Sequence, residues 1–179
     1  MPLSYEHTPD KTAEKDRIIK CGGSIYARQT GRYEKTTSSG NITVPILGPP
    51  RVWYPLINSP GDSMGLAMTR SLGDLSAHQV GVISEPHFLQ HDILESDEFV
   101  VLASDGLWDM YSYDDCMYMM HDFIISLDDP IKWDPQEAAE MLASHARKKW
   151  ETTNIPIDDI TCVVISLKSI RQNYGDIVG

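Results

Sequence analysis

Residues 97–109 read DEFVVLASDGLWD, an apolar run followed by two aspartates, Asp105 and Asp109. The run EFVVLAS has the β-branched and aromatic composition of a buried strand. A carboxylate that leaves water is destabilised unless a cation or a hydrogen-bond donor meets it. Asp105, at the end of this predicted strand, is therefore the first candidate for a functional side chain.

A second acidic pair borders another predicted strand, since Asp158 and Asp159 directly precede ITCVVISL. Neighbouring antiparallel strands place the end of one beside the start of the next, so Asp105 and Asp158 could meet at one rim of a sheet. Carboxylate oxygens without nearby His or Cys favour a hard cation such as Mg²⁺ or Mn²⁺. The alternative is structural: Asp105-Gly106 forms a turn and Asp158-Asp159 caps a strand.

Composition narrows the class of protein. The 179 residues suffice for one domain, and 41% hydrophobic and 23% charged residues are typical of a soluble globular chain. A formal net charge of −11 argues against a nucleic-acid or anionic-membrane partner. No apolar stretch is long enough to span a bilayer. Three scattered cysteines without a CxxC pair indicate reduced thiols, and hence a cytoplasmic or nuclear protein.

Two long helices are predicted in the second half of the chain. The first follows Ser112, with Asp115 three residues on as its capping-box partner. The second follows Asp134, with Pro135 at its first position and Glu137 as the box partner. Apolar residues recur at helical spacing in both, which predicts that each buries one face.

The rest of the chain reads as short strands after one short helix over residues 8–20. Residues 30–50 are turn-rich and predict a surface insertion with at most one short hairpin strand, over 42–47. Strands are predicted at SIYAR (24–28), RVWYP (51–55), VGVIS (80–84), PHFLQHDI (86–93), EFVVLAS (98–104) and TCVVISL (161–167), the last as an inner strand. Strands combined with amphipathic helices indicate an α+β or layered α/β/β/α domain.

Four stretches carry a family resemblance. LAMTRSLGD (66–74), ISEPHF (83–88), DEFVVLASDGLWD (97–109) and IDDITCVVISL (157–167) occur in this order. Together they closely resemble the C-terminal half of the metal-dependent protein Ser/Thr phosphatases, the type 2C family. Residues 3–23, LSYEHTPDKTAEKDRIIKCGG, are similar to another segment of that family. The resemblance implies part of a four-layer α/β/β/α sandwich, with antiparallel sheets and two long helices.

The resemblance also implies site residues. Asp105 occupies the place of the aspartate in the family's "DG[LIM]WD" motif, which ligates a binuclear Mg²⁺ or Mn²⁺ centre. Asp158 occupies the ligand position of the "D-N-[IM]-[ST]" motif, with Asp159 where Asn is usual. Structural roles, or roles in supporting the ligands, are implied for Arg70, Gly73, Asp74, Gly106, Asp109 and Asp159. Residues 24–65 correspond to a flap that shapes substrate access.

Several family motifs do not occur in these 179 residues. They are the acidic ligand with the phosphate-binding arginine, "D-G-H-G-G" and "G-D-S-R". We therefore expect residues 1–170 to be the C-terminal portion of a phosphatase domain, followed by a tail over 171–179. By itself this chain is expected to hydrolyse phosphate esters negligibly.

The function implied is hydrolysis of phosphoserine and phosphothreonine esters in phosphoproteins by a metal-activated water. Two alternatives stay open: a catalytically inactive relative that serves as a binding module, and a small acidic protein that binds divalent cations. Strand edges left uncovered in an incomplete domain favour self-association.

Overall fold

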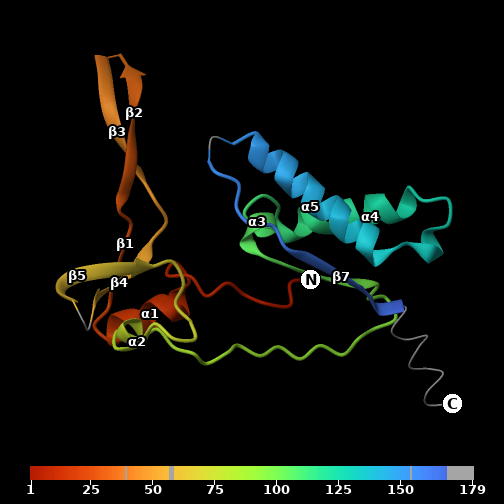
Figure 1. Cartoon of the computed structure of the whole chain (residues 1–179), viewed down its shortest axis with the longest axis horizontal. Helices are drawn as coiled ribbons and strands as arrows, with labels where there is room; N and C mark the ends of the chain where they lie inside the picture. The colour runs from red at the N-terminus through yellow and green to blue at the C-terminus, as the bar shows by residue number, and fades with distance from the viewer. Residues whose placement is uncertain (39, 57–58, 154, 169–179) are drawn as a thin grey trace. The chain divides into compact units, whose positions relative to one another are not determined.

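The computed structural model describes residues 1–38, 40–56, 59–153 and 155–168, and the chain divides into two compact units. One unit is Leu3–Leu89, and the other comprises Met1–Pro2 and the chain from Gln90 onward. Each unit has its own hydrophobic core. The predicted tail at 171–179 lies outside the described residues. Helices and antiparallel sheets occur together, which confirms the α+β class (Figure 1).

Helix α1 (Thr12–Lys20) opens the Leu3–Leu89 unit. It begins later than the predicted residue 8, because the N–H of Lys11 donates to the carbonyl of Thr8 in a turn that precedes the helix. It ends as predicted at a glycine pair, where Gly22 takes a left-handed φ of 81°.

A three-stranded antiparallel sheet follows, in the order β1 (Ser24–Tyr26), β4 (Arg51–Leu56) and β5 (Ser59–Leu66). Its core face carries Val52 and Tyr54, which are buried with Ile18 of α1. The same core contains Ala77 of the short helix α2 (Leu75–His78). Because side chains alternate along a strand, Arg51 and Trp53 occupy the opposite face.

Residues 29–47 form a full hairpin of β2 (Gln29–Thr37) and β3 (Gly40–Leu47), drawn in orange in Figure 1. The sequence predicted one short strand at most here, so that prediction was wrong in extent. The ladder runs from the Gln29–Leu47 pair to the Thr37–Gly40 pair, and Gly40 has a φ of +118°. The Ser, Thr and Gly residues of this segment are typical of a loop. The hairpin therefore depends on pairing between the two strands, which composition does not reveal.

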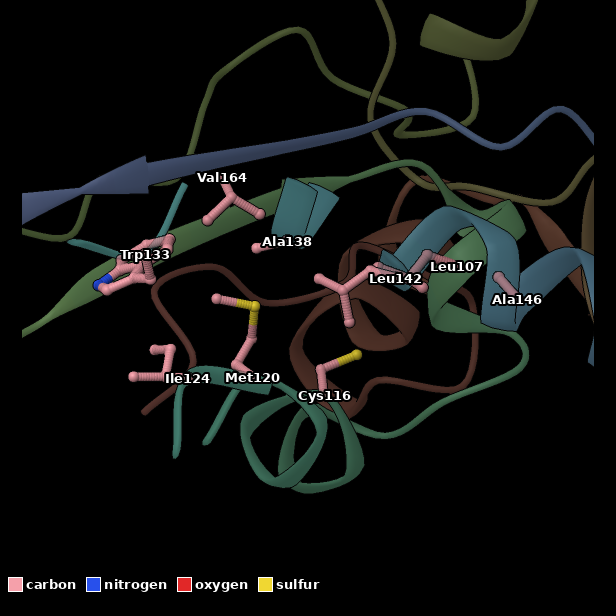
Figure 2. Close-up of a cluster of buried hydrophobic side chains, with 9 residues drawn as sticks. All are labelled: Leu107, Cys116, Met120, Ile124, Trp133, Ala138, Leu142, Ala146 and Val164. Atoms are coloured by element: carbon pink, nitrogen blue, oxygen red, sulfur yellow. The ribbon is translucent and has the colours of Figure 1, made fainter. Parts of the chain in front are cut away.

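In the second unit β6 (Phe99–Ala103) pairs antiparallel with β7 (Cys162–Ser166). The connection contains α3 (Asp105–Trp108), α4 (Tyr113–Ile125), the 3₁₀ helix η1 (Pro130–Lys132) and α5 (Pro135–Glu151). Figure 2 shows Cys116, Met120 and Ile124 of α4 directed towards Leu142 of α5 and Val164 of β7. This cluster is the core that fixes β6, and the turn after it, in place.

The starts of both long helices agree with the sequence prediction. Ser112 and Asp115 form the predicted capping box before α4. Before α5, Asp134 accepts from the N–H of Gln136 and Pro135 occupies the first turn, so a single cap replaces the predicted box with Glu137. Local capping chemistry is sufficient to place these boundaries.

Two predicted strands, at 80–84 and 86–93, are wrong. Residues 80–84 contribute an isolated parallel bridge between Arg70 and Ile83, and residues 86–93 form no strand. Phe88 is 83% exposed, so this apolar run lacks the buried face that a half-buried strand requires. β7, expected as an inner strand, pairs with β6 within the described residues and leaves Val163 exposed.

None of the described helices is long and apolar enough to cross a membrane.

Candidate metal centre

The strand pairing brings the two acidic segments together. Ala103 lies opposite Cys162 in the β6–β7 ladder, so the residues after β6 run beside the residues before β7. The contact continues past the strands, since the N–H of Ser104 donates to the carbonyl of Thr161 at 3.0 Å. The segments that carry Asp105 and Asp158 therefore meet at one rim of this sheet.

The hydroxyl of Ser104 joins these two segments. Its Oγ donates to the carbonyl of Asp159 at 2.9 Å and accepts from the N–H of Thr161 at 3.0 Å. The Ser104 hydroxyl thus acts as both donor and acceptor to the segment that follows Asp158. Ser104 directly precedes Asp105 in the chain. We call this arrangement of Ser104, Asp159 and Thr161 the Ser104 clasp.

Gly106 allows the segments to approach closely. A Cβ at this position would lie 2.4 Å from the carbonyl oxygen of Asp159, far inside van der Waals contact. Two indoles hold the same turn: Trp150 Nε1 donates to the carbonyl of Gly106 at 2.7 Å, and Trp108 Nε1 donates to the carbonyl of Ala103 at 2.9 Å. The backbone around Asp105 is thereby fixed on both sides.

The carboxylates themselves are exposed to solvent. Asp105 is the first residue of α3, and its carbonyl accepts from the N–H of Asp109 at 2.8 Å. One oxygen of Asp158 accepts from the N–H of Asp159 at 2.8 Å, and a carboxylate retains further lone pairs for a cation. Convergence of the Asp105 and Asp158 carboxylates on one ion stays a prediction.

The donor set fits a hard divalent cation as a partial shell. In the described part of the chain no three His, Cys, Asp or Glu side chains gather into a metal site. Asp105 and Asp158 therefore offer two carboxylates at most, and the rest of the shell would be water or other oxygen ligands. Mg²⁺ is commonly held in proteins by one or two carboxylates with several retained waters.

Arg70 belongs to a buried ionic cluster in the Leu3–Leu89 unit. Its Nη2 donates to Glu14 Oε1 at 2.6 Å, and Arg17 Nη2 donates to Glu14 Oε2 at 2.7 Å. The Thr69 hydroxyl lies 2.5 Å from the same oxygen, and Arg70 Nη1 donates to the carbonyl of Glu85 at 2.9 Å. We refer to Glu14, Arg17, Thr69 and Arg70 as the Glu14 cluster.

The Glu14 cluster sets the charge state of its carboxylate. Burial favours the neutral acid, but hydrogen bonds from Arg17, Arg70 and Thr69 outweigh it and hold the pKa of Glu14 well below its ordinary value. Glu14 is thus an anion held between two arginines, and Arg70 is engaged in joining α1 to residues 69–85. The structural role of Arg70 stays a prediction.

Gly73 and Asp74 form the turn that starts α2. Gly73 has a φ of +95° and Asp74 a φ of 46°, both in the left-handed region. The Asp74 carbonyl accepts from the N–H groups of Ala77 and His78. Glycine suits the first position because it has no Cβ, and aspartate is among the residues that tolerate the second.

Sequence reasoning missed Ser104, Trp150 and Glu14. The partners of Ser104 and Trp150 lie 55 and 44 residues away along the chain, so no local pattern marks them. Glu14 had a signal, because it lies three residues before Arg17 on a helix, where side chains meet. Cys116 lies in the core cluster, where burial raises the pKa of its thiol to about 11.

Comparisons with known proteins agree on one family. The family model described as Protein phosphatase 2C matches residues 1–155. The chain is 34% identical over 172 residues to "Probable protein phosphatase 2C 72" of Arabidopsis thaliana, covering 95% of this chain and 44% of that protein. It is 34% identical over 178 residues to "Probable protein phosphatase 2C 64" of Oryza sativa subsp. japonica, covering 97% of this chain and 35% of that one. The chain thus spans less than half the length of these relatives.

Solved structures show the same fold at lower identity. The crystal structure of serine-threonine phosphatase 2C from Toxoplasma gondii superposes with a TM-score of 0.62 at 20% identity, covering 92% of this chain and 46% of that chain. The structure of a C. elegans sex determining protein gives a TM-score of 0.59 at 22% identity, covering 92% and 31%.

Proposed function

Because the chain belongs to the protein phosphatase 2C family, we propose that the protein hydrolyses phosphoserine and phosphothreonine esters of phosphoprotein substrates. The observation that carries this proposal is the Ser104 clasp. It ties together the two segments whose aspartates match the family's ligand positions. Family membership also disfavours the alternative of an acidic cation-binding protein unrelated to phosphatases.

The proposed cofactor is Mg²⁺ or Mn²⁺, held in part by Asp105 and Asp158. When bound, such ions lower the pKa of a water and polarise phosphoryl oxygens. The chain's own residues bind and orient: the carboxylates supply oxygen ligands, and Ser104, Gly106 and Trp150 fix the backbone beneath Asp105. In a complete domain we propose a binuclear centre, which needs further carboxylates.

The 179-residue chain should hold a cation weakly and turn over little substrate. Phosphoryl transfer depends on positioning and on charge around the transferring group. The motif that supplies a phosphate-gripping arginine, and "D-G-H-G-G", do not occur in these residues. We propose a cytoplasmic or nuclear location, which the three free cysteines support.

Mn²⁺ binding tests the site directly. Calorimetric titration of Mn²⁺ into the chain should show binding that Asp105→Asn and Asp158→Asn each weaken, with phosphate release from an aryl phosphate measured in parallel. Asp128→Asn is the matched control, because Asp128 is an exposed aspartate in the loop after α4. Equal Mn²⁺ affinity in all four proteins contradicts the ligand assignment. Binding without turnover in a chain extended by the missing motifs would indicate an inactive relative.

A further inference from the structure

Charge is divided unevenly between the two units. Leu3–Leu89 contains nine lysines and arginines against eight acidic residues, for a net charge of +1. The other unit contains six basic and eighteen acidic residues, for a net charge of −12. Within the first unit, residues 26–56 carry four basic residues and a single acid, Glu34. The acidic chain therefore contains one basic segment, and it coincides with the hairpin and the middle of the three-stranded sheet.

Two arginines of this segment surround one tryptophan on the sheet's outer face. Arg51 and Trp53 occupy the face of β4 opposite the buried Val52. The Arg28 guanidinium lies 3.5 Å from the centre of the Trp53 ring. The Tyr26 ring stacks on Trp53 with centroids 5.0 Å apart and an interplanar angle of 14°.

The second guanidinium is anchored beside the same ring. Arg51 Nη1 donates to the carbonyl of Gly65 at 3.0 Å. Gly65 lies directly against Trp53, since a Cβ there would be 2.7 Å from the indole. We name Tyr26, Arg28, Arg51 and Trp53 the arginine face.

The arginines of this face lack acidic partners in the described part of the chain. No described carboxylate lies within ion-pair distance of Arg28 or Arg51, and Arg28 makes one long side-chain hydrogen bond, 3.4 Å to Ser63. A guanidinium carries five N–H donors, and toward the described residues Arg28 and Arg51 each use one of them, to Ser63 and to Gly65. Stacking on Trp53 holds Arg28 in place, which reduces the entropy lost on binding an anion.

We propose that the arginine face docks an acidic segment of a partner protein, rich in Asp, Glu or phosphorylated Ser. Arginine forks pair with carboxylates and phosphates through two parallel hydrogen bonds. Arg32 and Lys35 on the adjoining hairpin extend the positive charge along β2. This docking involves residues other than the proposed metal ligands and requires no cation.

A peptide fits this face better than a nucleic acid. A protein that contacts about 6–10 phosphates of a duplex neutralises them with Lys and Arg side chains, whereas the arginine face presents two fixed guanidinium groups. The net charge of −11 on the whole chain disfavours a long polyanion. A short acidic segment can bind the positive charge of the arginine face and experiences less electrostatic repulsion than a long polyanion.

Fluorescence anisotropy of a labelled peptide of alternating Glu and Ser, added to the full chain in EDTA, tests the docking. We expect saturable binding whose affinity falls as salt is added. The double change Arg28→Gln with Arg51→Gln should lower the affinity for the peptide about tenfold or more. Arg28→Lys keeps the charge but removes the planar guanidinium group. Its affinity for the peptide should lie between those of the unchanged chain and the double variant. The control Lys15→Gln with Lys20→Gln removes the same charge from exposed positions on α1 and should bind as the unchanged chain does.

Circular dichroism melts of every variant establish that each is folded before its binding is compared. Three outcomes of the peptide titrations overturn the proposal. They are no saturable binding of the Glu-Ser peptide, an equal loss in the α1 control, and unchanged binding in the folded double variant. Tighter binding of a single-stranded oligonucleotide, lost in the same double variant, would reassign the face to nucleic acid.

Discussion

A single hydroxyl joins the two segments on which the proposed metal site depends. Replacing Ser104 by Ala leaves the N–H of Thr161 and the carbonyl of Asp159 without their partner. We expect unfolding in urea to become easier by about 1 kcal/mol and Mn²⁺ affinity to fall, because the backbone beneath Asp105 and Asp158 loosens.

Two further variants separate the clasp from the general loss of a hydroxyl. Ser104→Thr retains the hydroxyl and should preserve Mn²⁺ affinity. Ser126→Ala removes a hydroxyl that donates to the Phe123 carbonyl at the end of α4, and should leave Mn²⁺ affinity unchanged. A Ser104→Ala protein that binds Mn²⁺ as the unchanged chain does would refute a positioning role for Ser104.

Gly106 should tolerate no side chain. In Gly106→Ala the methyl group meets the Asp159 carbonyl backbone, which cannot move aside as a flexible side chain does. We expect a loss of about 1–3 kcal/mol in urea unfolding, as for overpacked interiors. Gly31→Ala is the control, since its Cβ meets Ile46 at an ordinary 3.5 Å. Equal stability of the two variants would show that the segments carrying Gly106 and Asp159 can move apart.

At the site, sequence reasoning reached the aspartates but not what holds them. Asp105 and Asp158 were identified because strand borders and family motifs are short, contiguous segments of the sequence. The Ser104 clasp and the Trp150 bond depend on the register of β6 against β7 and on the packing of α5. These are long-range properties that a local pattern does not contain.

Among the elements, α1 depends on the Glu14 cluster for its attachment. Glu14 is 5% exposed and accepts from Arg17 and Arg70, so removing its charge leaves two arginines around a neutral group. We expect Glu14→Gln to destabilise the Leu3–Leu89 unit by about 3–5 kcal/mol at neutral pH. Hydrogen exchange of the Ile18 and Ile19 amides measures this loss, with the exposed Glu6→Gln as control.

The same cluster gives the unit a pH dependence of known sign. The folded pKa of Glu14 lies below its unfolded value, so its contribution is present at neutral pH. That contribution is lost as pH falls below the ordinary value of 4.5 towards the folded pKa. The protection factors of the α1 amides, which are their exchange rates corrected for the intrinsic rate at each pH, should therefore fall on acidification, and less so in Glu14→Gln. Parallel pH profiles for the two proteins would contradict the assignment.

The elements differ in how far local sequence determines them. The starts of α4 and α5 were predicted because caps and prolines act within a few residues. The 86–93 strand failed because strand formation requires a partner, and no described strand lies there. The β2–β3 hairpin was underestimated for the converse reason: the partner strand was adjacent in the chain, but its composition resembled a loop.

For the whole molecule, the outer face of the β6–β7 sheet predicts self-association. Leu102, Val163 and Ile165 are 52%, 50% and 36% exposed on a two-stranded ladder. Burying apolar surface and pairing a bare edge both favour association. Sedimentation should show oligomers at high concentration that shift towards monomer in Val163→Thr with Ile165→Thr, and not in the exposed Tyr118→Thr control on α4. A monomer at all concentrations would contradict this prediction.

The indoles around the Asp105 turn allow the proposed site to be followed by intrinsic tryptophan fluorescence, without any label. Trp108 and Trp150 donate to carbonyls on either side of Asp105, so their emission depends on the charge and rigidity of that turn. A paramagnetic ion such as Mn²⁺ quenches nearby indoles, whereas Mg²⁺ does not. Trp53 belongs to the other unit, in contact with Arg28. A Trp53→Phe protein would thus emit from one unit alone, and the difference between its Mn²⁺ and Mg²⁺ spectra would report the arrival of an ion at Asp105.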